Sequence, residues 1–78
     1  MVKVYSISTC PWCEKVKKYL QSRQVEFEER NIETDEEALK ECVKLTNDEA
    51  VPVITADGKE YVLGFDKAKI DAMLGLAS

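Results

Sequence analysis

The sequence predicts an α/β domain in which a four-stranded mixed sheet is flanked by three helices, in the order β-α-β-α-β-β-α. Short apolar segments rich in β-branched residues alternate with longer segments whose apolar residues recur every three to four positions. An Asp-Gly pair lies between the last two short segments, as in a hairpin. The chain has 78 residues, too few for two cores, so we expect residues 1–78 to form a single domain.

The first strand is predicted at Val2–Ile7, whose composition is typical of a strand covered on both faces. The helix that follows should have Cys10 as its last extended residue and Pro11 as its first helical residue, and should end near Arg23. Its apolar stripe consists of Val16, Tyr19 and Leu20. The second strand is predicted at Val25–Ile32, and the right-handed crossover between two consecutive strands should make them parallel.

The second helix should begin with a capping box in which Thr34 is the N-cap and Glu37 the third helical residue. Its predicted apolar stripe comprises Leu39, Cys42, Val43 and Leu45. Two antiparallel strands are expected on either side of Asp57 and Gly58. The last helix should have Asp66 as its N-cap and an apolar face made by Ile70, Met73 and Leu74.

Composition excludes several partners. The chain has 11 basic and 15 acidic residues, a net charge of -4, and its lysines are dispersed among the acids, so we expect no nucleic-acid partner. No apolar run approaches the roughly 20 residues needed to span a bilayer, and no signal peptide is recognisable, so we expect no membrane association and a cytoplasmic location.

The chain has three cysteines and no histidine, which limits the roles that its cysteines can have in catalysis or metal binding. Cysteines three apart at a helix start face the same side, about 5 to 6 Å apart, so Cys10 and Cys13 can cycle between dithiol and disulfide. Free N–H groups at the helix start should lower the pKa of Cys10 and make it the nucleophile, with the more shielded Cys13 as the resolving thiol. Trp12 offers a surface for substrate, whereas Cys42 is interpreted as a small buried hydrophobe.

A metal site is the main alternative for this pair. Half a zinc site is possible in principle, but the chain has no second C-x-x-C and no histidine to complete it, so no metal is expected. A structural disulfide does not suit a cytoplasmic chain with an odd number of cysteines.

The chain contains, in this order, "TCPWC" at 9–13, "VP" at 51–52 and "GFD" at 64–66. Together these segments resemble a dithiol glutaredoxin of the short bacterial type. The resemblance implies a thioredoxin-like fold and thiol–disulfide exchange, with glutathione as cosubstrate and disulfide-containing proteins as partners of a monomer. It also implies a cis peptide bond at Pro52, with the Val51 backbone free to pair with an extended substrate. The substrate contacts that it implies are Pro11, Trp12, Val51, Pro52, Gly64, Phe65, Asp66 and Lys67.

The chain departs from the family pattern ahead of the second segment. Many glutaredoxins that bind glutathione have a basic residue or glutamine there, and a lysine shortly before the first cysteine, whereas this chain has Asn47, Asp48 and Glu49 in the first place and Ser6 to Ser8 in the second. The carboxylates of Asp48 and Glu49 would repel the glycine carboxylate of glutathione. They are no handicap to an alternative, a redoxin that takes electrons from thioredoxin reductase and serves ribonucleotide reductase. A second alternative is an iron–sulfur carrier in which Cys10 of two chains and two glutathione molecules hold a [2Fe-2S] cluster. For Asp66, an N-cap role is as good an explanation as a glutathione contact.

Overall fold

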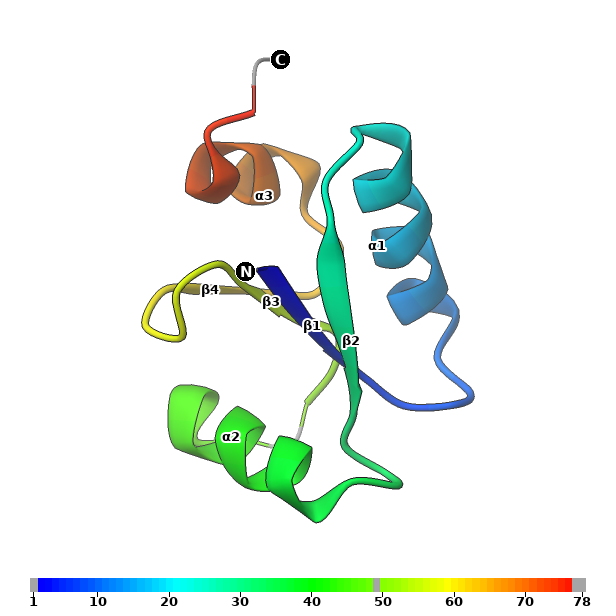
Figure 1. The fold of residues 1–78 in the computed structure, drawn as a ribbon, viewed down its shortest axis with the longest axis vertical. Coiled ribbons are helices and arrows are strands. Elements are labelled where there is room, and N and C mark those ends of the chain that lie inside the picture. Colours follow the sequence, from blue (N-terminus) through cyan, green and yellow to red (C-terminus); the bar gives the residue numbers. More distant parts are fainter. Residues whose placement is uncertain (1, 49, 77–78) are drawn as a thin grey trace.

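The structure is a computed structural model that describes residues 2–48 and 50–76. Its elements follow the predicted order (Figure 1). They are β1 (Val2–Ser6), α1 (Pro11–Ser22), β2 (Phe27–Asn31), α2 (Glu36–Thr46), β3 (Val53–Thr55), β4 (Tyr61–Leu63) and α3 (Lys67–Leu74). None of these helices, within the described residues, is both long and apolar enough to cross a membrane.

The four strands form one mixed sheet in the order β2-β1-β3-β4. β1 is parallel to β2, antiparallel pairing joins β1 to β3, and β3 is antiparallel to β4. The predicted parallel pair and the predicted hairpin are therefore confirmed. Because of these directions, the end of β1, the beginning of β3 and the end of β4 all lie at the same end of the sheet.

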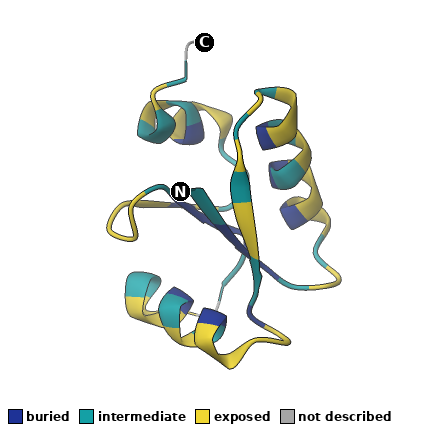
Figure 2. Cartoon of the chain, viewed as in Figure 1, coloured by how far each residue is buried: buried dark blue, intermediate teal, exposed yellow. Residues whose placement is uncertain are grey.

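Helices cover both faces of the sheet. α1 and α3 pack on one face, where Val4 of β1 lies in a buried cluster with Leu20 and Ile70. α2 packs on the other face, where the next residue of β1, Tyr5, lies in a cluster with Cys42. Neighbouring strand residues point to opposite faces, so β1 supplies both layers. Figure 2 shows the buried residues on the inner sides of α1 and α2 and along the central strands.

β2 is shorter than the predicted Val25–Ile32. The Val25 N–H donates to the Leu20 carbonyl (2.9 Å), and Gln24 has a left-handed φ of 59°, so these residues close the end of α1 instead of extending the strand.

The predicted N-cap of α2 is wrong by one residue. Asp35, not Thr34, caps the helix, and its carboxylate accepts hydrogen bonds from the Glu37 and Ala38 N–H groups. The Thr34 N–H donates to the side chain of Asn31, so Thr34 belongs to the preceding turn. The predicted stripe is also too wide, because Val43 is exposed.

The β3–β4 turn is wider than an Asp-Gly pair. Residues 56–60 separate the two strands, and only Gly58 has a positive φ (80°). Thr55 organises the loop: its hydroxyl accepts from the Gly58 N–H (2.9 Å) and donates to the Glu60 carbonyl (2.6 Å). The Asp57 carboxylate accepts the N–H groups of Glu60 and Lys59, which lowers its pKa.

Candidate active site at the start of α1

Cys10 is the N-cap of α1. Its backbone is extended (φ -123°, ψ 104°), and its sulfur accepts the Cys13 N–H at 3.1 Å. Pro11 occupies the beginning of the helix, where no N–H is needed. The predicted placement of Cys10 at the helix start is confirmed, and the sulfur lies where the free N–H groups of the first turn point.

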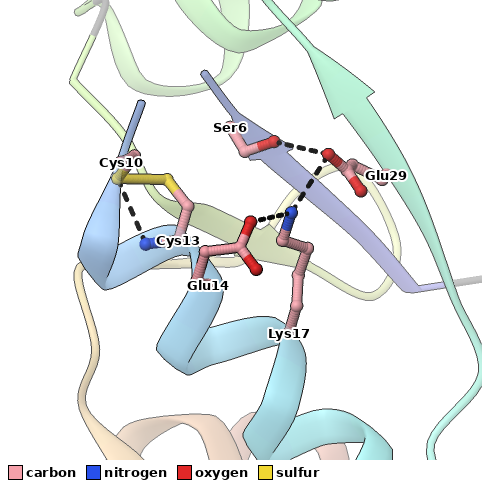
Figure 3. Close-up of a disulfide and its surroundings, with 6 residues drawn as sticks. All are labelled: Ser6, Cys10, Cys13, Glu14, Lys17 and Glu29. Carbon is pink, nitrogen blue, oxygen red and sulfur yellow. Dashed lines mark hydrogen bonds and ion pairs between the residues drawn. A yellow bond between two sulfur atoms is a disulfide. The ribbon is translucent and has the colours of Figure 1, made fainter. Parts of the chain in front are cut away.

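Cys10 and Cys13 form a disulfide, with their Cα atoms 5.2 Å apart (Figure 3). Cys13 is fully buried under the first turn, whereas Cys10 is only partly buried. A thiolate at Cys10 would occupy the position of a disulfide sulfur that already accepts a hydrogen bond. Of the two cysteines, Cys10 is therefore the more accessible.

A polar network lies beside the disulfide (Figure 3). The Lys17 ammonium contacts Glu14 of the same helix at 2.8 Å and Glu29 of β2 at 3.2 Å. The hydrogen bond with Lys17 lowers the pKa of Glu14, and the bond with Glu14 raises the pKa of Lys17. Glu29 also accepts the hydroxyl of the buried Ser6 at 3.4 Å. The network connects α1 to β1 and β2 and neutralises one of its two carboxylate charges.

Trp12 and Pro11 are exposed next to Cys10. Trp12 keeps 56% of its surface accessible, so it is not a core residue, and its contact with substrate stays a prediction. The Lys15 ammonium lies 4.5 Å from the centre of its ring. This cation–π contact holds the indole against α1.

The second and third segments of the site are joined directly. The Val51–Pro52 peptide bond is cis, as the resemblance implies. The Gly64 N–H donates to the Pro52 carbonyl at 2.8 Å, and Gly64 has the positive φ (82°) that glycine tolerates best. Val51 is partly buried and Pro52 is buried. Both segments lie at the end of the sheet from which the Cys10 loop leaves β1.

The beginning of α3 carries the last three candidates. Asp66 is the N-cap, and its carboxylate accepts the Lys69 N–H at 3.1 Å, so the N-cap interpretation is confirmed. Phe65 packs edge-on against Tyr19 of α1, with ring centres 6.0 Å apart. The Lys67 ammonium lies 5.5 Å from the Tyr19 ring centre and 5.7 Å from that of Phe65. Lys67 therefore extends over the rings between α3 and α1.

The segment ahead of Val51 and the third cysteine lie on the α2 side. Asn47 ends α2 in a left-handed conformation (φ 61°), Asp48 is exposed, and Glu49 is outside the described residues. Cys42 is fully buried in α2 and is not disulfide-bonded, as predicted. Among the described residues, no group of three or more acidic, cysteine or histidine side chains is placed to hold a metal ion.

Two features of the site were not predicted from the sequence. Glu29 joins Lys17 only because β2 lies next to β1, a proximity that depends on the fold. The contact of Lys67 with Tyr19 and Phe65 likewise needs α1 and α3 on one face. The i, i+3 spacing of Glu14 and Lys17 was the one local signal for the network.

Comparison with known proteins agrees with this geometry. The Glutaredoxin family model matches residues 2–61. The chain belongs to the glutaredoxin family. Its fold is the thioredoxin-like fold, shared with solved thioredoxin-like proteins and glutaredoxins. Glutaredoxins are thiol–disulfide oxidoreductases, and this chain is an enzyme of that class. The family uses glutathione as a reductant.

Three relatives illustrate the range of the family. A glutaredoxin-like 8.6 kDa protein of the rubredoxin operon of Clostridium pasteurianum is 42% identical over 74 residues, which are 95% of this chain and 97% of that protein. Glutaredoxin 3 of Escherichia coli is 32% identical over 75 residues, 96% of this chain and 90% of that protein. The solved NrdH-redoxin of Escherichia coli is 25% identical with a TM-score of 0.76, and the match covers 92% of each chain.

Proposed function

We propose that this glutaredoxin reduces protein disulfides and glutathione-mixed disulfides, with Cys10 as nucleophile, Cys13 as resolving thiol and glutathione as reductant. The observation that carries the proposal is the position of the Cys10 sulfur, accessible at the N-cap of α1 and hydrogen-bonded to the Cys13 N–H. A thiolate there is stabilised by this bond and by the positive end of the helix dipole.

The first half of the cycle oxidises the protein. The Cys10 thiolate attacks one sulfur of the substrate disulfide, that S–S bond breaks, and one substrate thiolate leaves. Cys13 loses its proton to solvent and attacks the Cys10 sulfur, which releases the second substrate thiolate. The substrate has gained two electrons, and the cysteines are left as a disulfide, the state in which they are found here.

The second half consumes two glutathione molecules. One glutathione thiolate forms a mixed disulfide with Cys10 and releases Cys13 as a thiol. The second attacks the glutathione sulfur, so that glutathione disulfide leaves and Cys10 returns to a thiolate. Protons are exchanged with water at each step.

Glutathione is an anionic, extended tripeptide, and three parts of the site suit it. The exposed Trp12 ring and Pro11 offer apolar surface next to Cys10. The Val51 backbone precedes β3 and offers the hydrogen bonds of an added strand. Gly64 and Phe65 bring the N–H groups of the α3 start to the same end of the sheet, where they favour a carboxylate.

The two charged residues at the start of α3, Asp66 and Lys67, are assigned to different groups of glutathione. Asp66 uses one carboxylate oxygen for the Lys69 N–H, and we assign its remaining capacity to the glutathione ammonium group. Lys67 is held over Tyr19 and Phe65, and we assign it to long-range attraction of a carboxylate.

A separate observation supports thioredoxin reductase as the electron donor in place of glutathione. Asn47 and the exposed Asp48 stand where a glutathione-binding site gains from a basic residue, and the related NrdH-redoxin is described with a thioredoxin-like activity profile. The second candidate is therefore a redoxin reduced by thioredoxin reductase that serves ribonucleotide reductase.

One experiment separates the two. NADPH oxidation is followed with a disulfide substrate and the protein, either with glutathione and glutathione reductase or with thioredoxin reductase alone. The proposal predicts faster turnover in the glutathione arm. Turnover only with thioredoxin reductase would overturn the glutathione assignment and leave the roles of the cysteines intact. The same cycle suits a monomer in the cytoplasm, where thiols are kept reduced.

A further inference from the structure

A hollow of about 320 Å³ lies between α1 and α3. Lysines and aromatic rings dominate its lining, which consists of Lys15, Lys18, Tyr19, Ser22, Phe65 and Lys67. At one end of the hollow the Lys15 ammonium lies 4.5 Å from the ring centre of Trp12, and Trp12 stands between Cys10 and Cys13 in the sequence.

Lys15, Lys18 and Lys67 do not occur in the salt bridges found between described residues, which join Lys3, Lys17 and Arg30 to glutamates. The charge of Lys18 acts on the Glu14 carboxylate only at longer range. Lys15 lies over Trp12, and Lys67 lies over Tyr19 and Phe65. Such cation–π contacts hold an ammonium group in place without cancelling its charge.

The nearby carboxylates already have other partners. Glu14 pairs with Lys17 at 2.8 Å, and Asp66 accepts the Lys69 N–H at 3.1 Å. Asp71 accepts the hydroxyl of Tyr19, which raises the pKa of that phenol. These bonds leave the charges of Asp66 and Asp71 in place, but neither residue lines the hollow, whose lining holds three ammonium groups and no carboxylate on a chain with a net charge of -4.

We propose that this hollow docks an acidic segment that flanks the reducible disulfide of a partner protein. The inference rests on the proposed function, because it places a partner's carboxylates next to the reactive pair. Lys15, Lys18 and Lys67 supply the charge complementarity, and the packed rings of Tyr19 and Phe65 supply an apolar floor for the aliphatic parts of the segment. Partners with neutral or basic flanks gain nothing from this surface.

The direct test is an NMR titration of the 15N-labelled protein with an acidic peptide that contains no cysteine. Amide shifts should concentrate at residues 15–22 and 65–67, and a neutral peptide of equal length should cause none. Lys18→Glu should weaken binding about threefold or more, because it replaces attraction by repulsion at one exposed contact. Lys44→Glu, an equal charge change on the opposite face of the sheet, should leave binding unchanged.

Kinetics give the second readout. With glutathione and its reductase in excess, a mixed disulfide of glutathione with an acidic peptide should be reduced with a higher kcat/KM than a neutral one, and both added salt and Lys18→Glu should remove the difference. Scattered amide shifts, or equal losses with Lys44→Glu and Lys18→Glu, would overturn the docking site. Because the titration needs no thiol, an inactive protein that still binds the acidic peptide would contradict the proposed function and not the docking site.

Discussion

The Cys10 sulfur accepts the Cys13 N–H at 3.1 Å, and this contact predicts how strongly the fold favours the thiolate. In a Cys13→Ser, Cys42→Ala variant, Cys10 is the only thiol and the backbone donor remains. A hydrogen bond to an ionised group contributes about 1.5 kcal/mol at the lower end of its range, which suits sulfur as a weak acceptor. The ratio of thiolate to thiol at Cys10 should then be about tenfold higher in the folded chain than in the unfolded chain, since about 1.4 kcal/mol corresponds to a factor of ten.

The assay is the rate of alkylation by iodoacetamide as a function of pH, measured for the folded variant and for the same variant in concentrated urea. The pH profile of the folded protein should lie at lower pH, because only the folded chain offers the N–H bond. The matched control, Cys10→Ser with Cys42→Ala, leaves only the buried Cys13, which should react far more slowly. Coincident profiles in the folded and unfolded variant would refute the reasoning.

Three further predictions concern stability. Burial, together with the Glu41 hydrogen bond, raises the pKa of Tyr5 from 10.0 to about 12, so the wild type should lose stability as the pH rises through this interval. Tyr5→Phe should lower the free energy of unfolding by about 1 kcal/mol at neutral pH, as measured by urea denaturation, and the difference from the wild type should shrink above pH 10. A difference that does not change with pH would contradict the raised pKa of Tyr5. Asp35→Ala should cost about 1 kcal/mol and Thr34→Ala almost nothing, and equal costs would contradict the cap assignment. Leu20→Ala should cost about 2–5 kcal/mol in thermal unfolding, because Leu20 is completely buried; a loss below 1 kcal/mol would be inconsistent with that packing.

Local signals in the sequence predicted most of the fold. The 3.6-residue pattern placed the buried Leu20 and Ile70 on inward helix faces, and proline after an extended cysteine placed Cys10 at a helix start. The error at Thr34 has a local cause: Thr34 and Asp35 are both good N-caps, and the choice depends on the Asn31 side chain, which binds the Thr34 N–H.

The rest of the site depends on contacts between elements distant in sequence. Glu29 reaches Lys17 because β2 is parallel to β1 and adjacent to α1, and Lys67 reaches Tyr19 because α3 packs beside α1. No spacing rule along the chain encodes these pairs. Residue type and position predicted the cysteine pair, and the spacing of Glu14 and Lys17 indicates their contact, whereas the contacts of Lys17 with Glu29 and of Lys67 with Tyr19 depend on the folded chain.

The central claim is that Cys10 is the nucleophile of disulfide reduction. The most direct measurement compares turnover of a protein disulfide by the wild type, Cys10→Ser and Cys42→Ala, with reductant in excess. The account predicts complete loss with Cys10→Ser and wild-type turnover with Cys42→Ala, whose thiol is buried in α2. Turnover that persists in Cys10→Ser would contradict it.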